Sequence, residues 1–204
     1  MGSEDTPYLK GFAMNITVII PSVTVEKLKQ SARRIKKKLG LSHHEALDKV
    51  AEMAGFNHWH HVIQMAAKTE PVETAFRSGL VYGFDASEAD FEAEFLEEIA
   101  SSVAEYFAKD SLWQFYKNVD AADDPELANM SDEEFKEFLE EELQGLVFFR
   151  FTGNELPQTV DGAIELIREF SFWNPAYVWL NGTLHSTFYA PMTDRDGNVV
   201  GVRF

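Results

Sequence analysis

The residues AYVWLNGTLHS at positions 176–186 decide the fold class of this chain. Asn181-Gly182 stands between two runs of apolar and aromatic residues, and this dipeptide is the strongest short-range marker of a β-hairpin because both residues tolerate a positive φ. Residues 146–151 are LVFFRF and predict another strand, while Asp196-Gly197 before residues 199–204 predicts a second reversal. The sequence therefore predicts an antiparallel sheet of about four strands in the C-terminal part.

Helical patterns lie between and before these strands. Residues 160–170 predict one helix, and Ser131 with Glu134 has the spacing of a capping box at the start of another. Apolar residues recur at helical steps over 87–109, with acids between them, so we expect one long amphipathic helix there. Residues 120–132 are rich in Asp, Asn and Pro and predict an exposed loop.

The first third of the chain has a different pattern. Residues 15–20 are NITVII, and this run of β-branched residues predicts a short strand. Apolar residues at steps of three and four over 24–67 predict three helices with short connections. The expected fold is α+β: a three-helix unit preceded by a short strand, then an acidic helical segment and the C-terminal sheet packed with helices. We expect three parts, namely a basic helical module at 1–68, a linker at 69–86 that runs into a strand or extended segment around Leu80–Tyr82, and an acidic α+β domain at 87–204.

Charge is divided unequally along the 204 residues, whose formal net charge is −16. Residues 1–80 have a net charge of +3, whereas residues 81–204 have a net charge of −19. Such asymmetry predicts two surfaces with different partners, although acids also serve solubility. The chain has no cysteine, which excludes disulfides, thiolate nucleophiles and cysteine zinc sites.

The basic surface lies on the helix predicted within residues 24–39. No acid interrupts its cations, which are Lys27, Lys29, Arg33, Arg34, Lys36, Lys37 and Lys38. Like charges on one helix repel one another, so an anionic neighbour is expected. Nucleic acid would supply it, and so would the acidic half of this chain or of a second copy in a homodimer. A solvated face without a partner is the remaining interpretation.

A strand followed by a basic helix and a second helix is also the order of a ribbon-helix-helix repressor. A DNA-binding autoregulator is therefore an alternative function. In such a ribbon alternate side chains contact base edges, yet Val18, Ile19 and Ile20 are successive apolar residues. Asn15 and Thr17 are the remaining candidates for base contacts, which weakens this alternative.

Residues 21–67 carry the pattern Ser-His-x-x-Ala-Leu from Ser42, followed by Gly-Phe-x-x-Trp from Gly55. This pattern resembles a small helical domain of plasmid- and phage-associated proteins, which is described as glyoxalase-related or of unknown function. The resemblance implies a helical fold and a mobile-element setting. It implies no glyoxalase activity here, because the paired βαβββ units that supply a glyoxalase metal site are absent from the pattern.

Five of the six histidines lie within residues 43–61. They are His43, His44, His58, His60 and His61. His58 and His61 share a helical face, and His43 or His44 could complete a zinc or nickel site, which would make a metal-dependent enzyme the second alternative. Capping and solvated roles are the common ones for histidines at helix starts, and no His-Glu-x-x-His motif is present. We therefore expect neither a resident metal nor another cofactor.

These observations predict a cytoplasmic, non-enzymatic interaction protein of a plasmid or phage. No segment approaches the roughly 18–20 apolar residues of a membrane span, so we expect no membrane contact. The basic module would meet a protein, a nucleoprotein or nucleic acid, and the acidic domain would bind a protein, in one variant by imitating a nucleic-acid duplex as a counter-defence inhibitor. The candidate partner-binding acids are Glu94, Glu97, Glu98, Glu105, Glu133, Glu137, Glu140 and Glu141.

Overall fold

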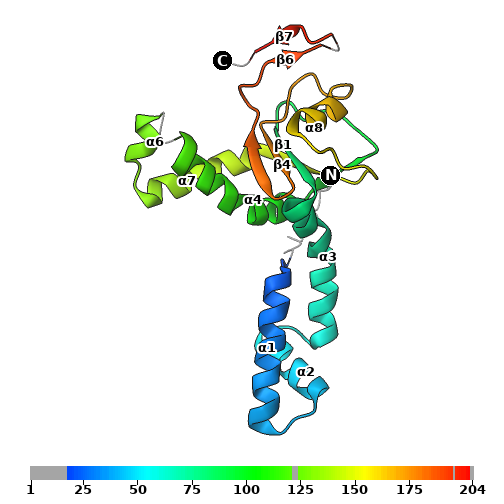
Figure 1. The fold of residues 1–204 in the computed structure, drawn as a ribbon. Helices are drawn as coiled ribbons and strands as arrows, with labels where there is room; N and C mark the ends of the chain where they lie inside the picture. Colours follow the sequence, from blue (N-terminus) through cyan, green and yellow to red (C-terminus); the bar gives the residue numbers. More distant parts are fainter. Residues whose placement is uncertain (1–17, 121–123, 195, 203–204) are drawn as a thin grey trace, which may run out of the picture.

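The structure is a computed structural model that describes residues 18–120, 124–194 and 196–202. Its α+β body contains the sheet, and a helical arm projects from that body (Figure 1). The arm consists of α1 (Ser22–Leu39), α2 (His43–Met53) and the first part of α3 (Trp59–Ser78). The predicted α+β fold is confirmed.

The body is built on a five-stranded antiparallel sheet with the order β2-β3-β1-β4-β5. Its strands are β1 (Leu80–Asp85), β2 (Leu96–Ile99), β3 (Leu146–Phe151), β4 (Tyr177–Leu180) and β5 (Thr183–Ser186). A separate two-stranded sheet follows, made of β6 (Met192–Thr193) and β7 (Val199–Gly201). The sheet thus confirms the antiparallel arrangement and places β1 at its centre.

The hairpin between β4 and β5 forms as the sequence predicts. Asn181 has a φ of 50° and Gly182 a φ of 82°, which is the pair of positive angles that a two-residue hairpin turn needs. A Cβ on Gly182 would also lie 2.7 Å from the carbonyl oxygen of Arg77. Glycine is therefore required there both by the turn and by the end of α3 behind it.

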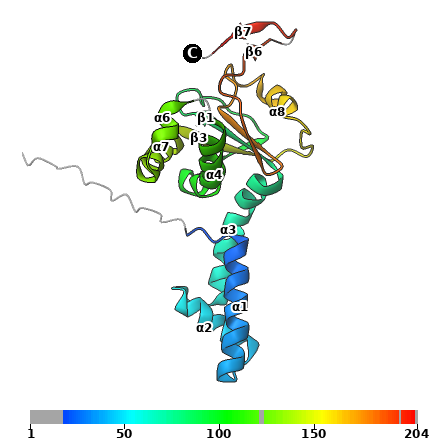
Figure 2. The ribbon, with the colours of Figure 1, turned by 60° about the vertical axis from the view of Figure 1, so that its left-hand side comes forward.

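Helices lie on both faces of the sheet (Figure 2). Side chains alternate across the strands and contribute to a separate core on each face. The first face presents Phe148 and Trp179 to the second part of α3, α4 (Ser101–Phe115) and α7 (Asp132–Gln144). The second face presents Tyr82 and Phe84 to α8 (Val160–Ile167) and to the segment at 86–95. Each face has its own apolar core, so the body has three layers.

Two small cores hold the arm together. One contains Ile20, Val25 and Val62, and the other contains Ala32 and Val50. The capping box at the start of α2 is present, because Ser42 and Glu45 exchange both of their expected hydrogen bonds. The three predicted helices of the N-terminal part are confirmed.

The linker predicted in the first part of 69–86 is wrong, because α3 continues to Ser78, but the strand expected at its end is present as β1. Pro71 lies inside α3, where a proline removes one backbone hydrogen bond. The loss is offset because the residues after it pack in the main core: Ala75 and Phe76 are 7% exposed. One helix therefore belongs to both the arm and the body.

The strand predicted at 15–20 is wrong over the part that the structure describes. Residues 18–20 have no strand pairing, and Ile20 is buried against α3 with its amide donating to Thr69 Oγ1 at 3.2 Å. Residues 15–17, including Asn15 and Thr17, lie outside the described residues. Among the described residues of this run, Ile20 packs in the arm and Ile19 packs against the main core of the body.

The single helix predicted at 87–109 is also wrong. Residues 87–95 are irregular, and β2 and α4 follow them. The helical spacing of Phe91 and Phe95 has another cause, since both rings pack on the sheet: Phe91 lies 5.0 Å from Phe84 and Phe95 lies 5.8 Å from Phe151 between ring centroids.

The loop predicted at 120–132 contains a short helix among its described residues, α6 (Pro125–Asn129), and Asp124 caps that helix. The π-helix η1 (Tyr116–Asp120) precedes it. The helix predicted at 160–170 ends earlier, at Ile167. The capping box of Ser131 and Glu134 is present at the start of α7.

Candidate functional site

Helix α1 is anchored at the body end by a carboxylate from α3. Pro21 precedes α1 and provides no side-chain cap, so the first amides of the helix need another acceptor. Glu73 supplies it: the Ser22 amide donates to Glu73 Oε2 at 2.8 Å, and the Ser22 hydroxyl donates to Glu73 Oε1. A negative charge at a helix N-terminus is favourable, so this contact fixes the start of α1 against α3.

The predicted cations of α1 form an exposed face. Lys29 is half-buried and pairs with Glu26 at 2.7 Å between Nζ and Oε1. The remaining six cations are exposed, and within the described part of the chain none of them forms an ion pair. Three of them occupy the last turn of α1, where cations interact favourably with the helix dipole.

This face lies away from the acidic body. In Figure 1 α1 runs from the body to the tip of the arm, so its last turn is remote from the sheet. Leu39 and Met53 add exposed apolar surface at the ends of α1 and α2, with exposed fractions of 56% and 71%. The chain's own acidic half therefore does not neutralise α1 within the described residues, so an external polyanion, a second copy and a solvated face without a partner are the interpretations that stay open.

The predicted histidine cluster does not assemble a metal site. His58 Nδ1 accepts from the His61 amide at 3.1 Å and caps α3, while His44 Nδ1 lies 3.5 Å from Asp48 Oδ2. His43 and His60 are exposed. In the parts of the chain that the structure describes, no group of three His, Asp or Glu residues could hold a metal ion. The metal-dependent alternative thus has no ligand set among them.

The predicted partner-binding acids are divided among several places. Glu97 and Glu98 are neighbours on β2, but they point to opposite faces of the sheet: Glu97 pairs with Arg150, whereas Glu98 lines a groove on the other face together with Glu94. Glu105 and Glu140 face a shallow depression between α4 and α7 that also contains Lys109, which lies 3.5 Å from Glu140. The remaining acids are exposed on α7 and are Glu133, Glu137 and Glu141.

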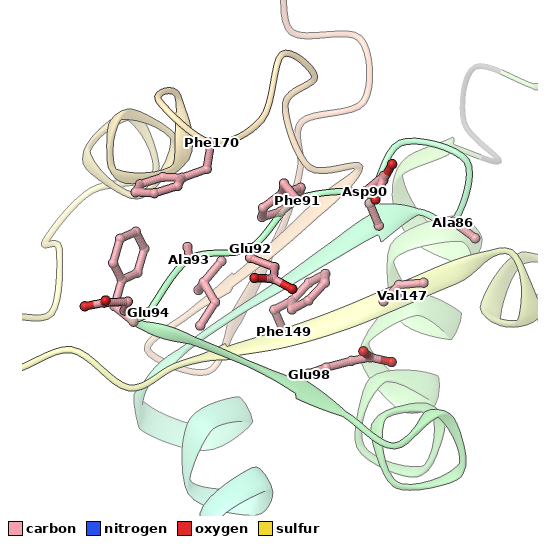
Figure 3. Close-up of a pocket in the computed structure, with 13 residues that line it drawn as sticks. Ala86, Asp90, Phe91, Glu92, Ala93, Glu94, Glu98, Val147, Phe149 and Phe170 are labelled. Carbon is pink, nitrogen blue, oxygen red and sulfur yellow. The ribbon is translucent and has the colours of Figure 1, made fainter.

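The groove that contains Glu94 and Glu98 is an open hollow of about 1250 Å³ on the second face of the sheet (Figure 3). We call it the acidic groove. Among the described residues its lining contains four carboxylates, six aromatic or large aliphatic side chains on strands and loops, and no cation. The lining residues are Ala86, Ala89, Asp90, Phe91, Glu92, Ala93, Glu94, Phe95, Leu96, Glu98, Val147, Phe149 and Phe170.

Aromatic contacts hold the segment 86–95 over the sheet and shape this groove. Phe91 lies 5.5 Å from Phe149, and Phe95 lies 5.3 Å from Phe170 in an edge-to-face contact. Figure 3 shows Phe149 and Val147 on the strands below this segment and Phe170 approaching from the side of α8. The apolar contacts thus leave carboxylates at the groove's margin.

Sequence reasoning missed Asp90, Glu92 and Phe170 as groove residues. The helix predicted at 87–109 would have spread the acids over a solvent-facing surface instead of placing them beside aromatic rings. The available signal was the aromatic content of 84–95, which is typical of a segment that packs on a sheet. Phe170 reaches the groove through tertiary packing, for which its local sequence gives no sign.

Comparisons with family models, with curated proteins and with solved structures find no match to this chain. The resemblance of residues 21–67 to the helical domain of plasmid and phage proteins therefore stays a prediction. None of the helices that the structure describes has both the length and the apolar composition needed to cross a bilayer.

Proposed function

We propose that this protein is a non-enzymatic adaptor that binds nucleic acid with α1 and a basic segment of a protein partner with the acidic groove. One observation carries the proposal: the six exposed cations of α1 form no ion pair in the described chain and lie on an arm away from the acidic body. Opposite charges on separate parts of one molecule favour different partners.

The dimensions of α1 suit a nucleic-acid backbone. From Lys27 to Lys38 the helix rises about 17 Å, since each residue adds about 1.5 Å. Duplex DNA carries a phosphate for about every 1.7 Å of its axis, so this length presents about ten phosphates. Lys and Arg on a helix supply backbone contacts, which give affinity without sequence selection. We therefore expect binding that depends strongly on salt and weakly on sequence.

The acidic groove supports the second half of the proposal. Its four carboxylates and its aromatic rings are complementary to lysine and arginine side chains, which form ion pairs and cation–π contacts. Asp90, Glu92, Glu94 and Glu98 would contact the charged ends, while Phe149 lies below them for the aliphatic stems.

The structure gives less support to two other functions, a ribbon-helix-helix autoregulator and a mimic of a nucleic-acid duplex. A ribbon-helix-helix autoregulator needs a paired ribbon, but residues 18–20 have no strand pairing, and Ile20 is packed in the arm instead. The duplex-mimic variant needs acids in one array, whereas Glu97 and Glu98 lie on opposite faces of the sheet. The plasmid or phage setting remains a proposal that rests on the resemblance of residues 21–67.

Fluorescence anisotropy with a labelled 30-base-pair duplex and a matched single strand tests nucleic-acid binding. If three phosphates are contacted, raising the salt from 50 to 200 mM lowers the binding constant about 40-fold, because the slope is about −0.9 per phosphate. The variant Arg33→Gln/Arg34→Gln/Lys37→Gln should lose this salt-dependent binding.

The control variant Lys109→Gln/Lys136→Gln/Arg168→Gln removes the same charge from the body. We expect it to bind nucleic acid as the unmodified chain does, because those cations lie off the arm. No binding at 50 mM salt, or an equal loss in the two triple variants, would overturn the assignment of α1.

A further inference from the structure

A second, smaller cavity of about 390 Å³ lies on the other face of the sheet from the acidic groove. It forms where the ends of β1, β3 and β4 meet η1 and α7, and we call it the tyrosine pocket. Its wall contains Tyr116 from η1, Tyr177 from β4 and Glu142 from α7. The full lining is Asp85, Tyr116, Asp124, Leu127, Phe138, Glu141, Glu142, Gly145, Leu146, Ala176, Tyr177, Ser186, Phe188 and Tyr189.

A hydrogen-bonded chain of buried groups forms one wall of this pocket. Tyr116 and Tyr177 are each 6% exposed, and their hydroxyl groups contact each other. The Tyr116 hydroxyl donates to Glu142 Oε2 at 2.9 Å. Burial, together with Tyr177 and Glu142, raises the pKa of Tyr116 well above its usual range, so this hydroxyl remains a donor. The chain thus holds the carboxylate of Glu142 in a fixed orientation at the pocket wall.

The charge of the lining has one sign. Carboxylates come from Asp85, Asp124, Glu141 and Glu142, and among the described residues no Lys, Arg or His lines the pocket. Asp85 and Asp124 already accept from the backbone amides of Ser87 and Glu126, each at 2.8 Å, so a ligand contact would depend on Glu142 and Glu141. A cation entering this space would meet negative charge without a competing positive group.

Aromatic rings surround the same space. Tyr116 packs edge-to-face on Phe138 at 5.0 Å and on Phe115 at 5.5 Å, while Phe188 and Tyr189 line the pocket from the segment after β5. Rings of this kind attract cations through their negative faces, and walls of several rings are the usual means by which proteins bind ammonium groups. The carboxylates and the rings therefore select the same ligand charge.

The backbone at the pocket is unusual as well. Tyr116 is the first residue of the π-helix η1, which follows α4 directly. π-Helical turns are rare and occur frequently at functional sites because the extra residue redirects side chains. Here η1 presents Tyr116 to Glu142, which is 26 residues away in sequence, and to Tyr177, which is 61 residues away.

We propose that the tyrosine pocket binds the ammonium group of an organic amine, with Glu142 as the counter-ion and the surrounding rings as the cage. The volume lies within the range of small-molecule sites, about 300–1000 Å³, and suits a compact alkylammonium ion. The ammonium group can belong to a free amine or to a lysine side chain of a protein partner, and the experiment separates these sources. The proposal does not depend on nucleic-acid binding by α1.

Isothermal titration of the full chain with tetramethylammonium, n-butylammonium and n-butanol at constant ionic strength tests the site. Both ammonium ions should bind, and n-butanol should not, because it has the size of n-butylammonium without its charge. Glu142→Gln should weaken ammonium binding about tenfold or more, since it removes the half-buried counter-ion. Glu133→Gln is the matched control, because it removes the same charge from an exposed position on the same helix.

Two further variants keep the test decisive if Glu142→Gln alters folding. Tyr116→Phe keeps the ring and removes the hydrogen bond to Glu142, so it should weaken ammonium binding less than Glu142→Gln does. Glu141→Gln removes a second lining charge without touching the buried chain and should also weaken binding. Equal heats for n-butanol and n-butylammonium, or unchanged ammonium binding in both Glu142→Gln and Glu141→Gln, would overturn the proposal.

A last titration identifies the source of the ammonium group. N-acetyl-lysine amide and a lysine-containing peptide are compared with n-butylammonium on the same protein. Tighter binding of the lysine compounds assigns the pocket to a protein side chain, and tighter binding of n-butylammonium assigns it to a free amine. Absence of binding by all of them rejects an ammonium site, and binding of DNA by α1 would be unaffected by that result.

Discussion

The contact between Glu73 and the start of α1 makes a prediction about the stability of the arm. Replacing Glu73 with Ala leaves the Ser22 amide without its acceptor at 2.8 Å and removes a negative charge from the N-terminus of α1. Pro21 provides no side chain that could replace it. The substitution should therefore release the first turn of α1 from α3 while the sheet stays intact.

The expected cost follows from two contributions. Loss of a helix N-cap costs about 0.5–2 kcal/mol, and loss of an anion at a helix N-terminus costs about 0.3–1 kcal/mol at a surface. Glu73 is half-buried, so we expect the substitution to destabilise the first turn of α1 by about 1.5 kcal/mol in total. At that cost the first turn opens about tenfold more often.

Amide hydrogen exchange measures this opening residue by residue. In Glu73→Ala the Ser22 amide and the next amides of α1 should exchange about tenfold faster, while amides in β1 should exchange as before. Glu70→Ala is the matched control, because it removes the same charge from an exposed residue of α3 that lies one turn before Glu73. Unchanged exchange at Ser22, or equal acceleration in Glu70→Ala, would refute the role of Glu73.

Three further predictions concern the body. Phe135 is fully buried, and its ring centroid lies 4.5 Å from that of Trp113. Phe135→Ala should therefore lower the free energy of unfolding in urea by about 3–5 kcal/mol. Phe172 is 63% exposed, so the control Phe172→Ala should lower it little. A Cβ on Gly83 would lie 3.2 Å from Trp179 Cζ3, so Gly83→Ala should lower stability by about 1–3 kcal/mol and shift tryptophan fluorescence. Hydrogen bonds from the Ser131 amide and hydroxyl lower the pKa of Glu134 from its ordinary 4.5, so the stability that this box gives is present above that value and is lost as the pH falls through the lowered pKa. Ser131→Ala removes the hydroxyl and keeps the amide, so it should raise the pKa of Glu134 only part of the way back in an NMR titration.

The elements that the sequence predicts correctly depend on local chemistry. Ser42 with Glu45 and Ser131 with Glu134 form their capping boxes because each bond joins residues three apart. The turn at Asn181-Gly182 forms because these two residues accept positive φ.

The errors arise where distant packing decides between two local patterns. Phe91 and Phe95 are four residues apart, which suits a helix, but their half-buried rings pack on Phe84 of β1 and Phe151 of β3. Pro71 suggests an interruption, but the burial of Phe76 in the main core sustains α3 beyond it. Neither the irregular segment at 87–95 nor the continuation of α3 beyond Pro71 can be predicted from about ten neighbouring residues alone.

The candidate sites divide in the same way. The cations of α1 are consecutive on one helix, so their common exposed face follows from helical geometry. The acidic groove and the tyrosine pocket are assembled from separate strands and helices, and Tyr116 meets Tyr177 across 61 residues of sequence. Such sites require the sheet register, which the sequence alone did not provide.

The continuity of α3 has a consequence for charge. A flexible linker at 69–86 would let a module of net charge +3 fold back on a body of net charge −19, and attraction within about 8 Å, the Debye length at physiological salt, would hold it there. A single helix that enters the body core at Phe76 prevents this collapse. The start of α1 is in turn fixed to that helix by Glu73 and Thr69. The rigid arm therefore keeps the cations of α1 available to an external anion, which is the physical basis of the proposed binding function.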